Sequence, residues 1–430
     1  MKILVVGSGG REHAIIRKLK QSPKAEKIFC CPGNGGISAD AECVAINAMD
    51  IEGVVNFSKE NQIDLVVVAP DDPLAAGMVD ALNAEGIMTF GPTKAAAQIE
   101  ASKVFAKDLM KQHNIPTASY EVFDDPAKAL SYIEQKNEYP VVIKADGLAL
   151  GKGVIIADDH DEAKEGLKEI MEDKVFGASG NQVVVEEFLT GPEVSVLAFV
   201  DGKTVVPMVS SMDHKRALDG DKGLNTGGMG TVAPNPYYTP EVAQQCMERI
   251  FLPTVKAMQE MGRPFKGCLY FGLMITPDGP KVIEYNCRFG DPETQVVLPL
   301  LESDLLTVMT ACTNGTLADT EVKFRDGAAA CVILASGGYP VSYAKGKEIT
   351  GLTDGQLPEM KDVTVYHSGT AFKDGKLVTA GGRVLGVTAA ADNLPDALAR
   401  AYEATGHIDF ENLHKRTDIG MRALKALAEL

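Results

Sequence analysis

Short apolar runs that alternate with loops and helical stretches constrain the fold of this chain most strongly. Three runs have strand length, and each precedes a loop rich in Gly, Pro, Asn or Asp: residues 2–6, 27–31 and 65–69. A fourth run, residues 87–90, ends in G-P-T-K. Strands that alternate with helices at this spacing form a doubly wound parallel sheet, whose ligands lie at the carboxyl ends of the strands. We therefore predict an α/β domain over residues 1–124.

The loop after the first run reads G-S-G-G-R-E and precedes a helical stretch. Backbone N–H groups at the start of a helix can face an anion, so this loop is a candidate phosphate or carboxylate site. Gly7 and Gly9 fit the dinucleotide pattern G-x-G-x-x-G, but its third glycine position is Glu12. A nicotinamide-binding domain is therefore disfavoured.

A predicted exit helix over residues 93–113 leads into a smaller α/β unit, residues 125–190. Within this unit a strand over residues 140–144 ends in Lys144, and A-D-G-L-A-L-G-K-G-V follows it. A glycine-rich hairpin with lysines can fold over a polyphosphate, because its amides bond oxygens and its ammonium groups neutralise charge. The P-loop pattern G-x-x-x-x-G-K-[ST] is absent, and a mobile surface hairpin is the alternative.

The small unit ends in another apolar run, residues 182–185, followed by E-E-F-L and then Gly191. A strand that leaves the unit into a hinge would present its backbone groups to the edge of an adenine ring. An edge strand with solvated acids is the alternative for this segment.

The next unit, residues 191–326, contains a hairpin that turns at residues 201–202 and then a long loop. Long loops inside compact domains are usually functional. This loop carries D-H-K-R from Asp213 and N-T-G-G-M-G from Asn225, which supply charges and close backbone approach.

Residues 281–295 read K-V-I-E-Y-N-C-R-F-G-D-P-E-T-Q, and this stretch offers the densest set of polar groups. In an extended backbone Glu284, Asn286 and Arg288 share one face, about 7 Å apart. Carboxylate and amide oxygens suit magnesium, and arginine suits a carboxylate or phosphate. The alternative is a strand whose polar face meets water.

The remaining residues, 327–430, form a predicted closing domain. Its expected elements are strands over residues 328–335 and 381–387 and helices over residues 394–405 and 416–430. A structural role is the expectation for its glycines.

Composition excludes several classes of function. The formal charge of −17 disfavours a nucleic-acid partner, which would need clustered Lys and Arg. There is no run of 18 uncharged apolar residues, so we expect no membrane span and a cytoplasmic location. The eight Cys show no C-x-x-C spacing, which favours buried free thiols over a zinc site or a disulfide framework.

The motifs in this order strongly resemble those of the glycinamide ribonucleotide synthetase (phosphoribosylamine–glycine ligase) family of the ATP-grasp superfamily, over essentially the whole chain. The family fold implies an N-terminal doubly wound domain, a mobile lid (residues 125–190), a central α+β domain and a small C-terminal domain. The implied reaction joins glycine to 5-phosphoribosylamine with ATP, through a glycyl phosphate, in the second step of de novo purine synthesis. The implied metal is Mg²⁺, with Mn²⁺ as a possible replacement, and the expected assembly is a monomer or weak homodimer.

The resemblance also implies roles for individual residues. The ATP-binding residues are Lys103, Lys144, Gly151, Lys152, Gly153, Glu186, Glu187, Phe188, Leu189 and Glu193. The metal ligands are Glu284 and Asn286, and the catalytic residues are Arg288, Lys144, Asp213 and Lys215. The substrate-binding residues are Gly9, Gly10, Arg11, Glu12, Gly33, Asn34, Gly35, Asp213, Lys215, Asn225, Gly227, Arg288, Asp291, Pro292 and Glu293. We expect His214 to position substrate rather than to titrate.

One departure from the superfamily concerns the metal. Many ATP-grasp enzymes have an acidic ligand on the preceding strand, which here reads L-Y-F-G-L-M-I. The metal would then rest on two side chains, phosphates and water.

Three other functions account for parts of the sequence only. Another ATP-grasp carboxylate–amine ligase or carboxylase is disfavoured by the D-H-K-R and G-D-P-E-T-Q loops. A nicotinamide-dependent oxidoreductase leaves residues 281–295 unexplained. A nucleotide-binding regulatory protein without turnover would be expected to lack Lys144, Glu284 or Asn286, and all three are present.

Overall fold

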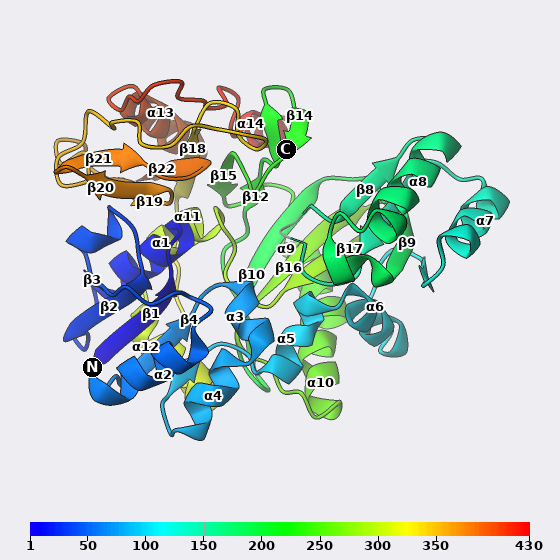
Figure 1. Ribbon diagram of the computed structural model, residues 1–430, viewed down its shortest axis with the longest axis horizontal. Helices are drawn as coiled ribbons and strands as arrows, with labels where there is room; N and C mark the ends of the chain where they lie inside the picture. The colour runs from blue at the N-terminus through cyan, green and yellow to red at the C-terminus, as the bar shows by residue number, and fades with distance from the viewer. Residues whose placement is uncertain (150–151) are drawn as a thin grey trace.

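The computed structural model describes residues 1–149 and 152–430. In Figure 1 the N-terminal unit (blue) lies below the C-terminal unit (orange and red), and a small unit with β8, α7 and α8 extends to the opposite end. A central sheet with β10, β16 and β17 lies between them. The predicted α/β class is confirmed.

The N-terminal unit contains the predicted doubly wound parallel sheet, with strand order β3-β2-β1-β4-β5. Its strands are β1 (Lys2–Gly7), β2 (Lys27–Pro32), β3 (Glu42–Cys43), β4 (Leu65–Val68) and β5 (Thr89–Phe90). Its helices are α1 (Gly10–Leu19), α2 (Ile51–Glu60), α3 (Asp71–Ala76) and α4 (Met78–Ala84). The N-terminus of α1 therefore follows directly from the carboxyl end of the central strand β1.

The predicted single exit helix is wrong. The structure has α5 (Lys94–Ala101) and α6 (Lys103–Gln112), separated at Ser102, whose φ is −129° and ψ 111°. The Ser102 hydroxyl accepts the Phe105 N–H at 3.1 Å, so it caps α6. A serine can compete with backbone hydrogen bonds in this way, which breaks a segment whose pattern reads as one helix.

The small unit has an antiparallel sheet with order β6-β9-β7-β8. Its strands are β6 (Tyr120–Phe123), β7 (Val141–Ala145), β8 (Val154–Ala157) and β9 (Val183–Glu187). The helices α7 (Pro126–Lys136) and α8 (His160–Leu167) pack on it through an apolar cluster. Because β9 lies between β6 and β7, the alternative of an edge strand at this position is wrong.

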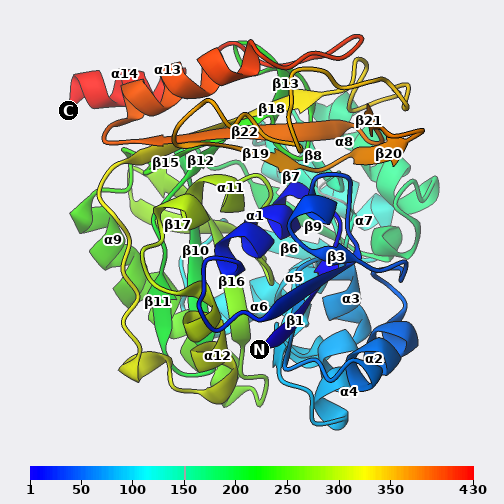
Figure 2. The same ribbon diagram turned by 90° about the vertical axis from the view of Figure 1, so that its left-hand side faces the viewer.

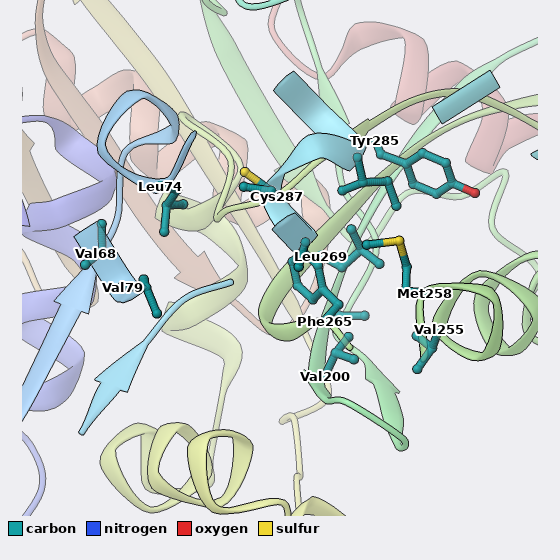
Figure 3. Close-up of a cluster of buried hydrophobic side chains, with 14 of the residues drawn as sticks. Val68, Leu74, Val79, Val200, Val255, Met258, Phe265, Leu269, Tyr285 and Cys287 are labelled. Carbon is teal, nitrogen blue, oxygen red and sulfur yellow. The ribbon is translucent and has the colours of Figure 1, made fainter. Parts of the chain in front are cut away.

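The central sheet has order β11-β10-β16-β17. Its strands are β10 (Glu193–Asp201), β11 (Val205–Pro207), β16 (Lys266–Thr276) and β17 (Gly279–Asn286). The helices α9 (Pro240–Cys246) and α10 (Leu252–Glu260) pack against it. Figure 3 shows this core, in which Phe265, Leu269 and Met258 pack together. The same cluster reaches Leu74 and Val79, so the central and N-terminal units share a core.

Simple alternation along β17 is wrong. Gly272 pairs with Glu284 and Leu273 with Val282, so Ile283 is an extra residue that forms a bulge. Val282 and Tyr285 consequently both enter the core, although their parity differs. The bulge leaves Glu284 and Asn286 on the polar side, and the Ile283 carbonyl accepts a hydrogen bond from Lys144 at 3.1 Å.

The C-terminal sheet is antiparallel with order β12-β15-β18-β22-β19. It combines β18 (Ala328–Ala335), β19 (Val363–His367) and β22 (Arg383–Ala391) with β12 (Met212–Asp213) and β15 (Gly230–Ala233) from the preceding unit. The helices α13 (Leu394–Thr405) and α14 (Met421–Glu429) lie along its outer side in Figure 2. The ends of the long loop therefore belong to the closing sheet.

The predicted helix over residues 416–430 is wrong at its start, since α14 begins at Met421. Gly420 has a left-handed φ of 82°, which ends the preceding turn. Arg416 is buried and donates to Asp418 and Asp221, and its guanidinium fixes an irregular segment there.

The smaller elements connect these units. They are α11 (Thr294–Val297), α12 (Leu305–Asn314), the hairpins β13 (Arg216–Leu218)/β14 (Lys222–Asn225) and β20 (Thr370–Lys373)/β21 (Lys376–Thr379), and short 3-10 or π turns. All eight cysteines are free and seven are buried, which confirms the expected free thiols. Within the described ranges, no helix is long and apolar enough to cross a membrane.

Candidate active site

Two lysines meet one buried carboxylate where β7 and β9 face β17. Lys144 Nζ lies 3.1 Å from Glu186 Oε1, and Lys107 Nζ lies 3.2 Å from Glu186 Oε2. Burial lowers the pKa of Lys107 to about 8, although Glu186 favours its charged form. The Glu186 side chain thus fixes two ammonium groups, and only its backbone is left for an adenine. The sequence analysis did not single out Lys107 as a site residue. Its spacing from Lys103, which puts both lysines on one side of α6, could have indicated it.

Lys103 touches the glycine-rich loop of the small unit. Its Nζ donates to the Gly147 carbonyl at 2.9 Å, and burial lowers its pKa. Asp146, one residue earlier, accepts from the Ser102 hydroxyl and the Val104 N–H, each at 3.2 Å. The break between α5 and α6 therefore holds the base of this loop.

The rest of the glycine-rich loop is described in part, and the hinge residues are described in full. Lys152 is exposed and Gly153 buried, whereas Gly151 lies outside the described residues. Glu187 accepts the Ser119 N–H at 3.0 Å, while Phe188 is exposed and Leu189 half-buried.

Glu284 carries its charge among cations. Lys215 Nζ lies 3.9 Å from Glu284 Oε1 and 3.8 Å from Glu193 Oε2. Burial alone would raise the pKa of Glu284, but Lys215, Lys144 and Lys103 together hold it below its usual value. The neighbouring Glu193 raises the pKa of Lys215. The Glu284 carboxylate and the Lys215 ammonium group are therefore both ionised at neutral pH.

Asn286 and Arg288 share a carboxylate that sequence reasoning missed, Glu100 on α5. Asn286 Nδ2 donates to Glu100 Oε1 at 2.9 Å, and Arg288 Nη2 lies 3.2 Å from the same oxygen. A lone carboxylate in an alanine-rich helix was the available signal.

The donor set of Glu284 and Asn286 fits a hard divalent cation. It supplies a carboxylate and an amide oxygen, and the described residues contain no cluster of three His, Cys, Asp or Glu side chains for a metal. Gly272 on β16 pairs with Glu284 on β17, and as a glycine it offers no second carboxylate. Phosphates and water would complete such a site, as magnesium tolerates.

A neighbouring pair of carboxyl groups, Asp213 and Glu293, lies close to Tyr270. Tyr270 Oη donates to Glu293 Oε1 at 3.1 Å and hydrogen-bonds the Ser195 hydroxyl at 2.8 Å. Burial and the neighbouring Glu293 raise the pKa of Asp213, and burial also raises that of Glu293. The pair therefore holds protons more tightly than exposed carboxylates do.

The first glycine loop contacts the Asp291–Glu293 turn. Arg11 N–H donates to Asp291 Oδ2 at 3.3 Å, and the Arg11 guanidinium pairs with Glu12 at 2.8 Å. A Cβ added at Gly10 would lie 2.6 Å from Gln295 Nε2, so the close approach requires glycine. Pro292, after Asp291, is buried in the same turn.

Arg383, which lies in the C-terminal domain, ties two of these loops together. Its Nη1 donates to the Gly227 carbonyl at 2.9 Å and to the Asp291 carbonyl at 3.0 Å. Burial opposes the charge of Arg383, but Asp291 raises the pKa of the Arg383 guanidinium. In turn, Arg383 and Arg11 lower the pKa of Asp291, although burial alone would raise it.

The second glycine loop packs against the closing domain. Asn34 Nδ2 donates to the carbonyls of Ser8 and His367, at 2.9 and 2.7 Å. Gly33 N–H donates to the Gly7 carbonyl and Gly35 N–H to the Thr370 carbonyl, both at 3.1 Å. These contacts use the Asn34 side chain to shape the cleft.

Two residues of the long loop lie away from the cluster. Asn225 is exposed at the end of β14, where it pairs with Arg216. His214, which we expect to position substrate rather than to titrate, has a buried ring that lies between the Gly230 carbonyl at 3.0 Å and the Gly420 N–H at 3.1 Å. Burial lowers its pKa to about 4.

Comparison with known families matches nearly the whole chain. The models described as phosphoribosylglycinamide synthetase match in three parts: the N domain over residues 1–100, the ATP-grasp (A) domain over residues 101–294 and the C domain over residues 329–422.

Curated relatives agree. A phosphoribosylamine–glycine ligase of Caldanaerobacter subterraneus subsp. tengcongensis is 50% identical over 419 residues, 97% of this chain and 99% of that protein. The trifunctional purine biosynthetic protein adenosine-3 of Gallus gallus is 48% identical over 100% of this chain and 43% of its own length.

Solved structures show the same architecture. The phosphoribosylamine–glycine ligase of Thermotoga maritima superposes with a TM-score of 0.85 at 34% identity, over 97% of this chain and all of that one. A biotin carboxylase of Campylobacter jejuni has a TM-score of 0.76 at 14% identity, over 100% of this chain and 98% of that one, which is a likeness of fold alone.

Proposed function

The chain belongs to the phosphoribosylglycinamide synthetase family, and from that premise we propose that it ligates glycine to 5-phosphoribosylamine with ATP. The products are glycinamide ribonucleotide, ADP and phosphate, in de novo purine synthesis. The family and the ATP-grasp fold predicted from the sequence are confirmed by the match over 101–294 and by the structural superposition.

One observation carries the proposal. In a chain of formal charge −17, Lys103, Lys144 and Lys215 surround the oxygen donor Glu284 and together lower its pKa. Such a group of cations can hold a polyphosphate and the metal that accompanies it.

ATP would bind with its phosphates at Lys103 and Lys144, under the glycine-rich loop that Lys103 already contacts at Gly147. Glu186, which also pairs with Lys107, holds Lys144 in place. The backbone of residues 187–189 follows as the adenine-reading hinge, and Glu193 as the acceptor for ribose hydroxyls. Lys152 and Gly153 belong to the loop that closes over the phosphates, as does Gly151.

Glu284 and Asn286 would hold Mg²⁺, or Mn²⁺ in its place. A metal bound by these residues would neutralise negative charge on the transferred phosphoryl group. The donors fit, since Glu284 is ionised and the hydrogen bond from Asn286 Nδ2 to Glu100 leaves its Oδ1 free to face a cation.

Glycine activation follows from the position of Arg288. Its guanidinium can hold the glycine carboxylate, one oxygen of which attacks the γ-phosphorus of ATP while the bond to the β-phosphate oxygen breaks. Glycyl phosphate and ADP result. Phosphoryl transfer needs positioning and charge neutralisation rather than a protein nucleophile, so Lys144, Lys215 and Arg288 suffice.

The amine of phosphoribosylamine then attacks the glycyl carbon, and phosphate leaves with the oxygen that came from glycine. The nitrogen must lose a proton, and we assign its acceptance to the Asp213 and Glu293 pair, because burial raises the pKa of both carboxyl groups. The loops at Gly9–Glu12, Gly33–Gly35 and Gly227, with the Asp291–Glu293 turn, form the proposed site for the phosphoribosyl part.

Partners and location remain predictions. We propose small-molecule substrates alone, with no nucleic acid, no membrane, a cytoplasmic location, and a monomer or weak homodimer.

The dinucleotide alternative meets a specific obstacle in the first loop. A Cβ placed at Gly7 would overlap the Glu12 side chain, which is buried beside the glycines and accepts the Gly9 N–H at 3.0 Å. The carboxylate therefore occupies the position where a pyrophosphate would approach the backbone.

The test supplies ATP, Mg²⁺, glycine and phosphoribosylamine generated in place, and follows release of ADP. We expect release that depends on glycine and is lost in Lys144→Gln. Release that is indifferent to glycine would contradict the proposal.

A further inference from the structure

Glu100 is a carboxylate next to the proposed metal site, and both of its oxygens have hydrogen-bond or ion-pair partners. The reaction proposed above assigns it no role. It lies in the last turn of α5 and is 8% exposed. Its Oε1 accepts from Asn286 Nδ2 at 2.9 Å and faces Arg288 Nη2 at 3.2 Å. Its Oε2 accepts from the Cys287 N–H at 2.8 Å and from Cys287 Sγ at 3.0 Å.

These contacts fix which end of the Asn286 amide faces Glu100. A carboxylate only accepts hydrogen bonds, so the amide NH₂ must point toward Glu100. The amide oxygen then points away, and among the described residues it receives no hydrogen bond. Glu100 therefore turns the one atom of Asn286 that can bind a cation toward the cleft.

The same carboxylate holds Arg288. The Arg288 Nη1 donates only weakly, at 3.4 Å, to the Phe289 carbonyl. Buried Nε finds no hydrogen-bond partner in the parts of the chain that the structure describes. Glu100 is thus the main anchor of a guanidinium that must otherwise meet the glycine carboxylate.

The helix break explains why Glu100 can do this. Because α5 ends at Ala101 and Ser102 turns away, the last turn of α5 meets the end of β17 rather than continuing past it. Glu100 is held in turn by the backbone N–H of Cys287, the residue that follows β17.

We propose that Glu100 is a positioning residue that sets the amide orientation of Asn286, and hence metal affinity, and that aims Arg288. This inference rests on the proposed function, since it takes Asn286 as a metal ligand. Residues that orient metal ligands typically contribute about 10- to 100-fold in metal affinity.

The test is a cycle of Glu100→Gln, Asn286→Asp and the double variant. In Glu100→Gln the amide oxygen must still accept the buried Cys287 N–H, which places the new NH₂ against Asn286. Asn286 then flips and presents its own NH₂ to the metal. We expect binding of Mn²⁺ in the presence of ADP, followed by electron paramagnetic resonance, to weaken about tenfold or more.

The other two variants separate orientation from general damage. In Asn286→Asp the new carboxylate faces that of Glu100, so binding is expected to weaken although aspartate is a good ligand. In the double variant the amide NH₂ introduced at position 100 donates to the carboxylate introduced at position 286, whose second oxygen faces the metal. We expect its affinity to return to within about threefold of the wild type, because both hydrogen-bond partners are restored.

Glu85→Gln, which removes a surface ion pair with Lys59, is the matched control and should bind as the wild type does. The Tm of each metal-free variant monitors folding. Wild-type affinity in Asn286→Asp or in Glu100→Gln would overturn the proposal, as would a double variant no better than the singles. A Glu100→Gln that fails to fold still leaves Asn286→Asp and the double variant decisive. Failure of the proposed function would instead appear as wild-type ADP release that is indifferent to glycine, whatever the Mn²⁺ affinities of these variants.

Discussion

At the scale of single residues, Glu284 is the clearest case of a group whose charge depends on its neighbours. Replacing it by glutamine removes the carboxylate that three lysines stabilise. We expect Glu284→Gln to raise the Mg²⁺ concentration for half-maximal ADP release by about tenfold or more, because one of two side-chain donors becomes neutral. Glu302→Gln, on a surface ion pair with Lys323, is the control. An unchanged magnesium dependence would remove Glu284 from the site.

Two buried histidines make stability depend on pH. Burial lowers the pKa of His214 and of His367 to about 4 each, from 6.5 in an exposed chain. Between these pH values the two histidines are protonated in the unfolded state but not in the folded state. The free energy of unfolding therefore falls as pH drops from about 6.5 toward 4. At pH 5 each histidine contributes a loss of about 2 kcal/mol.

Urea unfolding at pH 7.5 and pH 5 measures this loss. We expect His367→Gln to lose about 2 kcal/mol less than the wild type between these values. His160→Gln, at an exposed position, should not reduce the loss. An equal loss in His367→Gln and wild type would contradict the assignment.

At the scale of elements, the residues at the break between α5 and α6 connect the small unit to the rest of the molecule. Ser102 Oγ and the Val104 N–H both donate to Asp146, at the base of the glycine-rich loop. We expect Asp146→Asn to raise the KM for ATP about fivefold with a smaller change in kcat, because the loop must then be ordered by ATP itself. Steady-state kinetics give both constants. Asp158→Asn, exposed beyond the far end of the same hairpin, is the control, and an equal KM in the two variants would count against the anchor.

Elements whose local pattern decides their structure could be predicted from the sequence. β18 over 328–335 and α13 over 394–405 match their predicted bounds because continuous apolar runs and helical periodicity set them. The Ser102 break, the bulge at Ile283 and the late start of α14 could not be predicted. Each depends on a partner far away in the sequence. The break at Ser102 depends on Asp146, the bulge at Ile283 on the pairing with β16, and the start of α14 on the acids that hold Arg416.

The same distinction holds for the candidate site. Lys144, Glu284 and Arg288 could be singled out because they lie in motifs. Glu100, Lys107 and Arg383 lie outside the motifs and act only through contacts across the fold, such as Arg383 on Gly227 and Asp291. His214 lies inside a motif, yet its partners are two backbone groups.

At the scale of the whole molecule, the cleft is assembled from all parts of the chain. Arg11 meets Asp291, Lys103 meets Gly147, and Arg383 meets Gly227. The closing sheet takes β12 and β15 from the long loop, so the C-terminal part carries the frame on which Asp213 and Lys215 are placed. Figure 1 shows the small unit at the opposite end from this frame.

The proposed reaction activates glycine as an acyl phosphate. Glycine labelled with ¹⁸O at both carboxyl oxygens distinguishes this route, with mass spectrometry of the inorganic phosphate formed during turnover. We expect one labelled oxygen in each phosphate, since the attacking carboxylate oxygen leaves with phosphorus when the amine displaces it. Phosphate that carries no label while glycinamide ribonucleotide accumulates would contradict it.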